Sequence, residues 1–256
     1  MGPRVPRWQP CLAGAKVPVL IQLLFRAGLA LAQDYSPANQ PDRNDTWKQC
    51  RGNDPDARLI ACSRLIDAVQ ETPAETASAH YARGNAYRQK SLFSQALDDY
   101  NAAINANPSL SDAYGDRGIT LTVLGRFVDA IPDFTRVIEA YPRMAFAHYN
   151  RGVCYELIGL DDLAIEDIST SIEIEPRAEF RFERRGTIYF RKNLLDRALA
   201  DYEAALVINL QYASALYGRG LIRMRNGDLA GGGADVAAAT HHRPNIAAEM
   251  ARAGVK

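Results

Sequence analysis

The sequence lacks the short motifs that carry most enzyme chemistry. It contains no glycine-rich phosphate loop, no nucleophile elbow and no His-Glu zinc signature. Adjacent acidic residues such as Asp98 and Asp99 point in different directions on a helix, as ordinary solvated charges do. His241 and His242 have no nearby cysteine or carboxylate pair to complete a metal site. These absences predict a chain that is not an enzyme and that binds no cofactor and no metal.

An excess of either charge is also missing. The 256 residues contain 30 basic and 30 acidic side chains. The first 33 residues nevertheless hold four basic residues and no acid, and the first carboxylate is Asp34. Without this leader, 26 basic and 30 acidic residues remain, a net charge of −4. A mildly acidic protein is a poor ligand for a polyanion, so no nucleic-acid partner is predicted.

Long apolar runs are absent except near the N-terminus. The run Val17–Phe25 follows a basic stretch and precedes Ala30-Leu31-Ala32, with small residues where a signal peptidase reads. Residues 1–32 are therefore predicted to be a signal peptide cleaved after Ala32, followed by a linker over 33–44. This predicts a periplasmic or secreted protein. Since no other stretch approaches the roughly 20 apolar residues of a membrane span, the mature chain is predicted to have no integral membrane segment. The alternative is a cytoplasmic adaptor or accessory subunit with an uncleaved N-terminal segment.

What the sequence does contain is an internal repeat of 34 residues. The dipeptide Arg-Gly recurs at this step, at Arg83-Gly84, Arg117-Gly118, Arg151-Gly152, Arg185-Gly186 and Arg219-Gly220. An aspartate stands fifteen residues after each glycine, at Asp99, Asp133, Asp167, Asp201 and Asp235. Further columns hold Ser, Gly or Asn seven residues after the glycine, Ala or Gly twelve after it, and Pro or Leu twenty-four after it. Such a period is typical of a solenoid of equivalent units.

Each column has a physical reason in a helical hairpin. The Ser, Gly or Asn column suits the left-handed residue that ends the first helix. The Pro column suits the end of the second helix, because proline has no N–H to continue it. A glycine inside a helix costs about 1 kcal/mol relative to alanine, so five of them indicate a close approach of the two helices. Large apolar residues at helical spacing, such as Tyr87, Tyr100 and Ile104, complete the pattern.

These columns resemble the tetratricopeptide repeat (TPR) family, and in particular its exported bacterial members. The resemblance covers Ala77 to roughly Pro244 and implies an all-α fold, a right-handed superhelical solenoid of helical hairpins. The predicted units span residues 77–110, 111–144, 145–178, 179–212 and 213–244, and residues 245–256 are predicted to form a capping helix. The chain departs from the family in one column: the position before the glycine, usually apolar, is always arginine.

The arginine and aspartate columns recur together, which suggests that they pair. Our hypothesis is that each arginine contacts an aspartate on the second helix, in its own repeat or in the preceding one. A partly buried, bidentate pair fixes helix register more than it adds stability. The alternative is two columns of independently solvated charges. Four residues before their glycines stand His80 and His148, in a column that is structural in the family, so core packing is predicted for both.

Upstream of the repeats, residues 45–76 are predicted to form a degenerate helical hairpin. Its apolar residues follow the spacing of the second helices, and Pro73 stands where most repeats have their helix-ending proline. Cys50 and Cys62 lie on the two sides of a break in this hairpin. A disulfide between them would staple a unit too short to hold itself, and an exported protein can keep one. Two buried free thiols are the alternative.

The resemblance also implies a partner-binding groove lined by the first helices. The candidate groove residues are Tyr81, Asn85, Arg88, Phe146, Tyr149, Glu156, Phe180, Glu183, Phe190, Arg191 and Tyr217. Aromatic residues with flanking charges suit an interface that has an apolar centre and a polar rim. The alternative is that several of these aromatics pack between repeats. The predicted function is a non-enzymatic scaffold that binds a protein or peptide partner in this groove.

Overall fold

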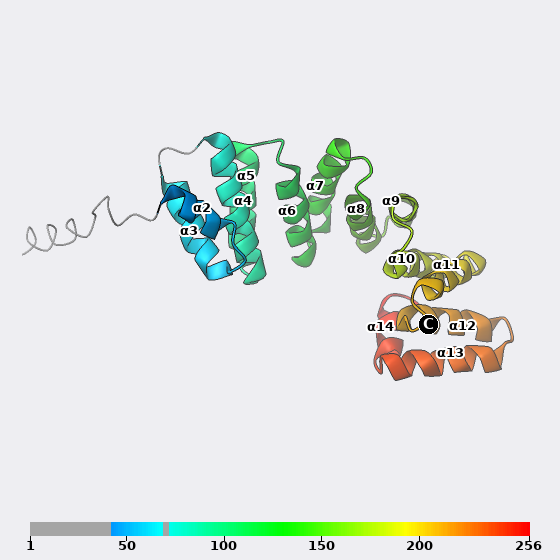
Figure 1. Cartoon of the computed structure of the whole chain (residues 1–256). Helices are drawn as coiled ribbons and strands as arrows, with labels where there is room; N and C mark the ends of the chain where they lie inside the picture. Colours follow the sequence, from blue (N-terminus) through cyan, green and yellow to red (C-terminus); the bar gives the residue numbers. More distant parts are fainter. Residues whose placement is uncertain (1–41, 69–71) are drawn as a thin grey trace, which may run out of the picture. The chain divides into compact units, whose positions relative to one another are not determined.

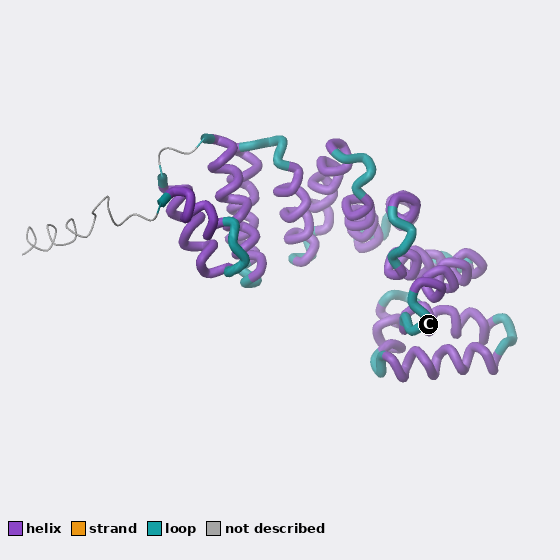
Figure 2. Tube along the Cα trace, in the orientation of Figure 1, coloured by secondary structure: helices purple, strands orange, loops and turns teal. Residues whose placement is uncertain are grey.

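The computed structural model describes residues 42–68 and 72–256, and in this part of the chain helices alternate with loops and no strand occurs (Figures 1 and 2). The predicted signal peptide and most of the predicted linker lie outside the described residues. Within the described ranges, no helix is both long and apolar enough to cross a membrane. The all-α solenoid expected from the 34-residue period is therefore confirmed.

Five hairpins follow one another along the chain. Their first helices, called A helices below, are α4 (Pro73–Gln89), α6 (Ser111–Val123), α8 (Ala145–Leu157), α10 (Glu179–Arg191) and α12 (Ala213–Arg225). Their second helices, called B helices, are α5 (Phe93–Ala106), α7 (Phe127–Ala140), α9 (Asp161–Ile174), α11 (Leu195–Ile208) and α13 (Leu229–His242). Each A helix packs most extensively against its own B helix, and each B helix packs against the next A helix.

The turn inside each hairpin is made at the Ser, Gly or Asn column. These five residues have positive φ angles: Ser91 (58°), Gly125 (74°), Gly159 (81°), Asn193 (59°) and Gly227 (93°). In each turn the next N–H reaches back five residues to a carbonyl of the A helix. This is the hydrogen bond of a Schellman motif, and it satisfies a carbonyl that the helix end would otherwise leave free.

The glycine column lies where A and B helices are closest. A Cβ atom added at Gly84 would lie 2.8 Å from the ring of Tyr100, which is fully buried. In the fifth hairpin a Cβ at Gly220 would lie 2.8 Å from the carbonyl oxygen of Gly232. Gly232 takes the place of the alanine found in the other repeats. The helical glycines therefore permit the close approach of the A and B helices, as the sequence predicted.

The N-terminal end holds two short helices, α2 (Arg43–Cys50) and α3 (Pro55–Asp67), joined by a disulfide between Cys50 and Cys62. One boundary differs from the prediction, because α4 begins at Pro73, inside the predicted 45–76 hairpin. The reason is a capping box at Thr72 and Glu75, with Pro73 at the first helical position. Pro73 thus starts the A helix of the first repeat instead of ending the preceding unit.

At the other end, helix α14 (Ile246–Arg252) follows α13. Ile246 and Met250 on this helix, and Val255 just after it, are almost completely buried. They belong to one hydrophobic cluster with Leu216 and Ile222 of α12. The last segment therefore covers apolar surface that the final hairpin would otherwise expose, as a solenoid requires of its ends.

Candidate partner-binding face and the arginine–aspartate ladder

Every arginine of the Arg-Gly column binds the aspartate of its own repeat through two parallel hydrogen bonds. Nε donates to Oδ2 and Nη2 to Oδ1, at distances of 2.6 to 2.9 Å in all five repeats. The five aspartates are buried, so Asp99 is not the ordinary solvated charge that its place beside Asp98 predicted. We call this set the ladder; its pairs are Arg83–Asp99, Arg117–Asp133, Arg151–Asp167, Arg185–Asp201 and Arg219–Asp235. Each pair ties an A helix to its B helix in one fixed register.

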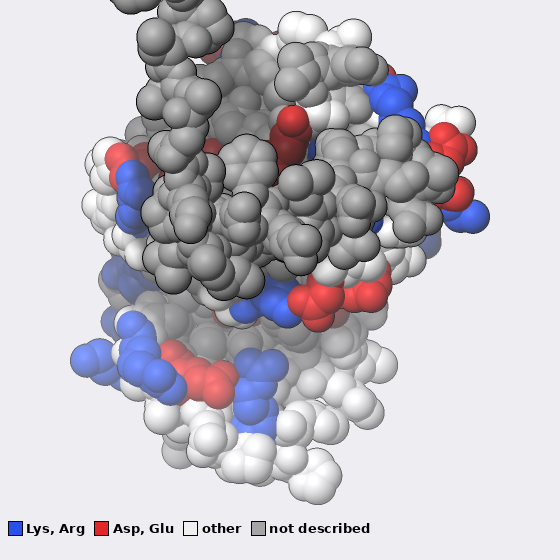
Figure 3. Space-filling model, turned by 90° about the vertical axis from the view of Figure 1, so that its left-hand side faces the viewer, with Lys and Arg blue, Asp and Glu red and all other residues white. Residues whose placement is uncertain are grey.

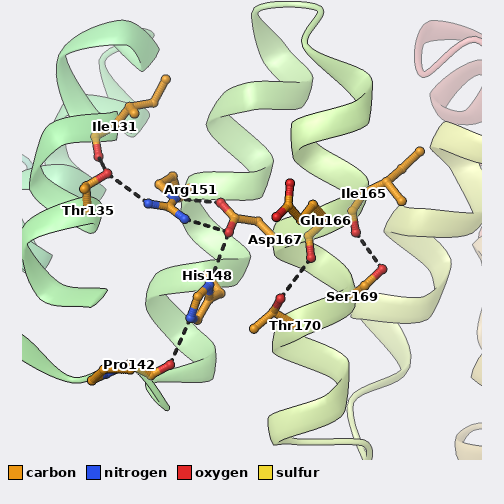
Figure 4. A network of polar contacts seen from close by, with 10 residues as sticks. All are labelled: Ile131, Thr135, Pro142, His148, Arg151, Ile165, Glu166, Asp167, Ser169 and Thr170. Atoms are coloured by element: carbon orange, nitrogen blue, oxygen red, sulfur yellow. Dashed lines mark hydrogen bonds and ion pairs between the residues drawn. The ribbon is translucent and has the colours of Figure 1, made fainter. Parts of the chain in front are cut away.

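The third guanidinium nitrogen connects neighbouring repeats. Nη1 of Arg151 donates to the hydroxyl of Thr135 on the preceding B helix, at 3.1 Å (Figure 4). Arg117 and Arg185 make the same contact with Asn101 (2.6 Å) and Ser169 (2.8 Å). Arg83 reaches Ser63 of α3 in a similar way, at 2.9 Å. One side chain therefore joins three helices, and the five-donor fork of arginine suits this role in a way that lysine does not.

Histidines complete the ladder in the first and third repeats. Nδ1 of His80 lies 2.8 Å from Asp99 Oδ1. Nδ1 of His148 lies 3.2 Å from Asp167 Oδ1, while its Nε2 lies 3.0 Å from the carbonyl oxygen of Pro142 (Figure 4). Sequence reasoning predicted core packing for both and missed these contacts. The available signal was that each histidine stands three residues before the arginine of its repeat, on the same face of the A helix.

The pKa values of two ladder aspartates diverge because their neighbours differ. Burial tends to raise the pKa of Asp99, but hydrogen bonds from His80 and Arg83 outweigh it and hold that pKa below the ordinary value. Asp133 has Arg117 but no histidine, and burial raises its pKa above the ordinary value. The negative charge of Asp129 adds to the rise at Asp133, so the two sites differ in one hydrogen-bond donor and in one neighbouring charge.

The predicted groove residues lie on the A helices, and many of them contact the next A helix. The Tyr81 hydroxyl on α4 donates to Asp116 on α6 at 2.8 Å. Arg88 lies 3.6 Å from the same carboxylate. Asn85 accepts a hydrogen bond from the hydroxyl of Tyr100 at 2.6 Å. In the first repeat, therefore, the candidate residues form a polar network that links two repeats.

Aromatic side chains dominate the A helices of the third and fourth repeats. Tyr149 on α8 and Phe180 on α10 meet edge to face, with ring centroids 5.0 Å apart. Phe146 packs at 79° against Phe134, with centroids 6.2 Å apart. Phe146 and Phe180 are still 38% and 39% exposed. These aromatics therefore do both things the sequence allowed: they pack between elements and they offer apolar surface to solvent.

Beside the aromatics lies a charged cluster centred on Glu156. Its carboxylate contacts Arg184 at 2.5 Å and Arg191 at 2.7 Å, so it links α8 to α10. Arg191 also donates to Asp161 at 2.8 Å. Glu183 accepts a hydrogen bond from Thr187 at 3.0 Å, and burial raises the pKa of the Glu183 carboxyl. Sequence reasoning placed Glu156, Glu183 and Arg191 on this face but did not foresee the contact between Glu156 and Arg191.

The remaining candidates, Phe190 and Tyr217, are partly buried against the C-terminal hydrophobic cluster. The face shared by α4, α6, α8, α10 and α12 is called the A-helix face below. It comprises polar contacts in the first repeat, exposed aromatics in the third and fourth, and a covered region in the fifth. In the view of Figure 3, basic and acidic residues are interspersed over the described part of the surface, without a continuous patch of either sign.

Comparisons with known proteins agree with this architecture. Family models described as tetratricopeptide repeat match residues 77–110 and 116–178, and one described as TPR repeat matches residues 186–227. No curated protein matches the sequence.

Similar solved structures include a crystal structure of MamA, at 21% identity and a TM-score of 0.60, covering 64% of this chain and 96% of that one. MamA from Desulfovibrio magneticus RS-1 has 18% identity, a TM-score of 0.60, and coverage of 66% and 94%. YrrB, a TPR protein whose structure is described as having an unusual peptide-binding site, has 18% identity, a TM-score of 0.62, and coverage of 76% and 99%. At these identities the likeness concerns the fold.

Proposed function

Because the chain belongs to the tetratricopeptide repeat family, we propose that it is a non-enzymatic scaffold that binds a protein or peptide segment along its A-helix face. The observation that carries the proposal is the pair Phe146 and Phe180. Each is more than one-third exposed, and each packs edge to face against another aromatic ring. Rigid, partly exposed aromatics are the residues that most often anchor a protein partner.

The surroundings of these rings support a protein partner in preference to a nucleic acid. Glu156, Glu183 and Arg191 lie on the same helices as the aromatics, which gives an apolar centre with charged residues of both signs around it. Nucleic-acid binding requires a continuous basic surface. The ladder adds a further property, because it fixes the hairpins in register and so holds the binding surface in shape before the partner arrives.

The proposed site of action is the periplasm or the outside of the cell. The leader over residues 1–32 and the predicted cleavage after Ala32 are the first support. The disulfide between Cys50 and Cys62 is the second, since structural disulfides persist mainly in oxidising compartments.

Affinity capture from an envelope fraction tests the proposed function. The bait is the protein with Phe146→Ala and Phe180→Ala, beside the wild type. Tyr141→Ala is the matched control, because Tyr141 is a 53% exposed aromatic that caps the end of the B helix α7. The double variant should lose at least one partner that the wild type and the control retain. Identical partner lists for all three proteins would refute the assignment of the A-helix face.

A further inference from the structure

The C-terminal segment, residues 246–255, presents three apolar anchors on one side. Ile246 and Met250 are four residues apart on α14, so they lie on the same helix face. Gly254 then adopts a φ of +87°, and the N–H of Val255 bonds back to the carbonyl of Met250 at 2.9 Å. This turn brings Val255 onto the same side. The exposed fractions of Ile246, Met250 and Val255 are 0%, 3% and 0%.

These anchors are buried mainly on the A-helix side of the last hairpin. Helix α14 packs chiefly against α12 and less against α13. In the repeats the order is the reverse, since each A helix packs more against the preceding B helix than against the preceding A helix. The anchors share a cluster with the candidate groove residues Phe190 and Tyr217. Figure 1 shows the chain turning after α14, and Val255 beyond that turn shares a cluster with Leu216 and Ile222 of α12. Gly254 stands 34 residues after Gly220, so the segment continues the repeat register in sequence, but α14 packs differently from an A helix.

The segment also reaches back to the fourth repeat. Nη1 of Arg191 on α10 lies 3.4 Å from the carbonyl oxygen of Ala253. A Cβ atom at position 254 would lie 2.6 Å from Cδ of Arg191, so a side chain there would have to displace Arg191. Arg191 is oriented from its other side by Glu156 and Asp161. A charged residue of the A-helix face thus holds the chain's own backbone.

We propose that the A-helix face of the fourth and fifth repeats is a peptide-binding site, and that the chain's own residues 246–255 occupy it. A partner that binds there must first displace this segment. The inference rests on the proposed function, because it takes the A-helix face to be the binding surface. The occupant defines what fits: a short helix with aliphatic residues at positions i and i+4, followed by a glycine turn and a third aliphatic residue.

Few interactions hold residues 246–255 on the rest of the protein, so a partner can displace them. Helix α14 has only seven residues, and a helix of this length does not persist alone in water. It lies outside the ladder, and its ion pair with the preceding turn, Arg243–Glu249, is exposed. The ordered state of the segment therefore depends on three apolar side chains and the contact with Arg191. An external ligand can bind only to the fraction of molecules whose site is free, and its apparent affinity is reduced by that fraction. The segment therefore sets the affinity of the site.

The test uses the full chain and a fluorescent synthetic peptide with the sequence of residues 244–256. Gly254→Val should loosen the segment, because a side chain there meets Arg191 and the left-handed backbone disfavours valine. Gly227→Val is the matched control: it also replaces a glycine of positive φ, at +93°, but nothing lies within 4 Å of its Cβ position. Peptide binding is measured by fluorescence anisotropy, and release of residues 246–255 by hydrogen exchange.

We expect Gly254→Val to exchange the amides of residues 246–255 faster and to bind the peptide about tenfold more tightly than the wild type or the control. Equal peptide binding by the three proteins would overturn the inference. So would a Gly254→Val protein whose segment exchanges faster while it binds no peptide, because the segment would then be a structural cap alone. Either negative result concerns residues 246–255 only, because the capture experiment on Phe146 and Phe180 tests the proposed function independently.

Discussion

Arg151 holds Asp167 with two parallel hydrogen bonds, Nε to Oδ2 at 2.7 Å and Nη2 to Oδ1 at 2.8 Å, across the two helices of one repeat. The Asp167 side chain is only 6% exposed and that of Arg151 is 19% exposed. Removing the arginine would therefore leave a charge in the interior without its main partner. Keeping both residues adds little net stability, since burying two charges offsets most of their attraction.

The first prediction follows from this asymmetry. Arg151→Ala should lower the free energy of unfolding by about 3 kcal/mol, because Asp167 is then buried without its partner. The double variant Arg151→Met/Asp167→Leu should recover most of that loss, because neither position then carries a charge. Urea denaturation followed by circular dichroism measures both. A double variant as unstable as the single one would contradict the argument.

The exposed pair Arg136–Glu139 provides the control. Its two side chains are 53% and 59% exposed, so solvent already screens their interaction. Arg136→Ala should leave the denaturation midpoint unchanged within error. A loss comparable to that of Arg151→Ala would show that any arginine on this scaffold matters, whatever its burial.

The second prediction concerns pH. Because the pKa of Asp99 is lowered in the folded protein, its stabilising contribution is complete above the ordinary value of 3.8 and is lost as the pH falls through the folded pKa. The pKa of Asp133 is raised, so its contribution has the opposite sign: it favours folding at low pH and fades as the pH rises through the folded pKa. Carboxyl carbon shifts in an NMR titration should give Asp99 the lower midpoint.

His80→Phe isolates the cause of this difference. Phenylalanine keeps a ring in the column, as Phe182 does in the fourth repeat, but removes the hydrogen bond at 2.8 Å to Asp99. The midpoint of Asp99 should then rise toward that of Asp133. If it stays where it was, Arg83 alone sets the pKa and the histidine has no electrostatic role.

Some of this structure could be predicted from the sequence and some could not. The turns and the ladder could be, because each depends on residues that recur every 34 positions with one chemical property. The acceptor of the third arginine nitrogen was harder to predict, because Asn101, Thr135 and Ser169 occupy one column of the repeat but share a polar atom and not a residue type. The start of α4 was ambiguous, because Pro73 suits both the end of one helix and the first turn of another.

The binding face, too, could be predicted only in part. Repeat geometry was enough to put Phe146, Phe180 and Glu156 on the A helices. The residues that these side chains contact could not be predicted, because each contact occurs in one repeat only. The contact of Arg191 with Glu156 is an example. The burial of Val255 is the extreme case: Val255 stands 34 residues after Leu221, but the turn at Gly254, where the other repeats have a helical glycine, has no counterpart in them.

The third prediction uses the turn column. Gly125 has a φ of +74° and nothing lies within 4 Å of its Cβ position, so Gly125→Ala changes the backbone preference alone. It should cost about 1 kcal/mol, the penalty for an L side chain in the left-handed region. Ser91 has a φ of 58°, and Ser91→Gly should therefore gain a few tenths to about 1 kcal/mol. Opposite signs in thermal denaturation confirm the argument, and equal signs refute it.

The last prediction concerns the bridge between Cys50 and Cys62. The bridge closes a loop of about 12 residues, for which the loop-entropy model gives about 3 kcal/mol. Because each unit of a solenoid contacts only its neighbours, the loss should be confined to α2, α3 and the start of α4. Trp47 reports on this region specifically: it is 7% exposed, lies in the same cluster as both cysteines, and is the only tryptophan of a chain that begins at Gln33.

In the chain that begins at Gln33, reduction of the disulfide should shift the fluorescence of Trp47 to the red. Hydrogen exchange in α8 to α13 should stay unchanged. Cys50→Ser/Cys62→Ser should show the shifted spectrum from the start and should not respond to reductant. Cys154 does not confuse the experiment, because it is fully buried and burial raises the pKa of its thiol, which makes it a poor nucleophile. Unshifted fluorescence after complete reduction would mean that packing around Trp47 holds the N-terminal hairpin without the bridge.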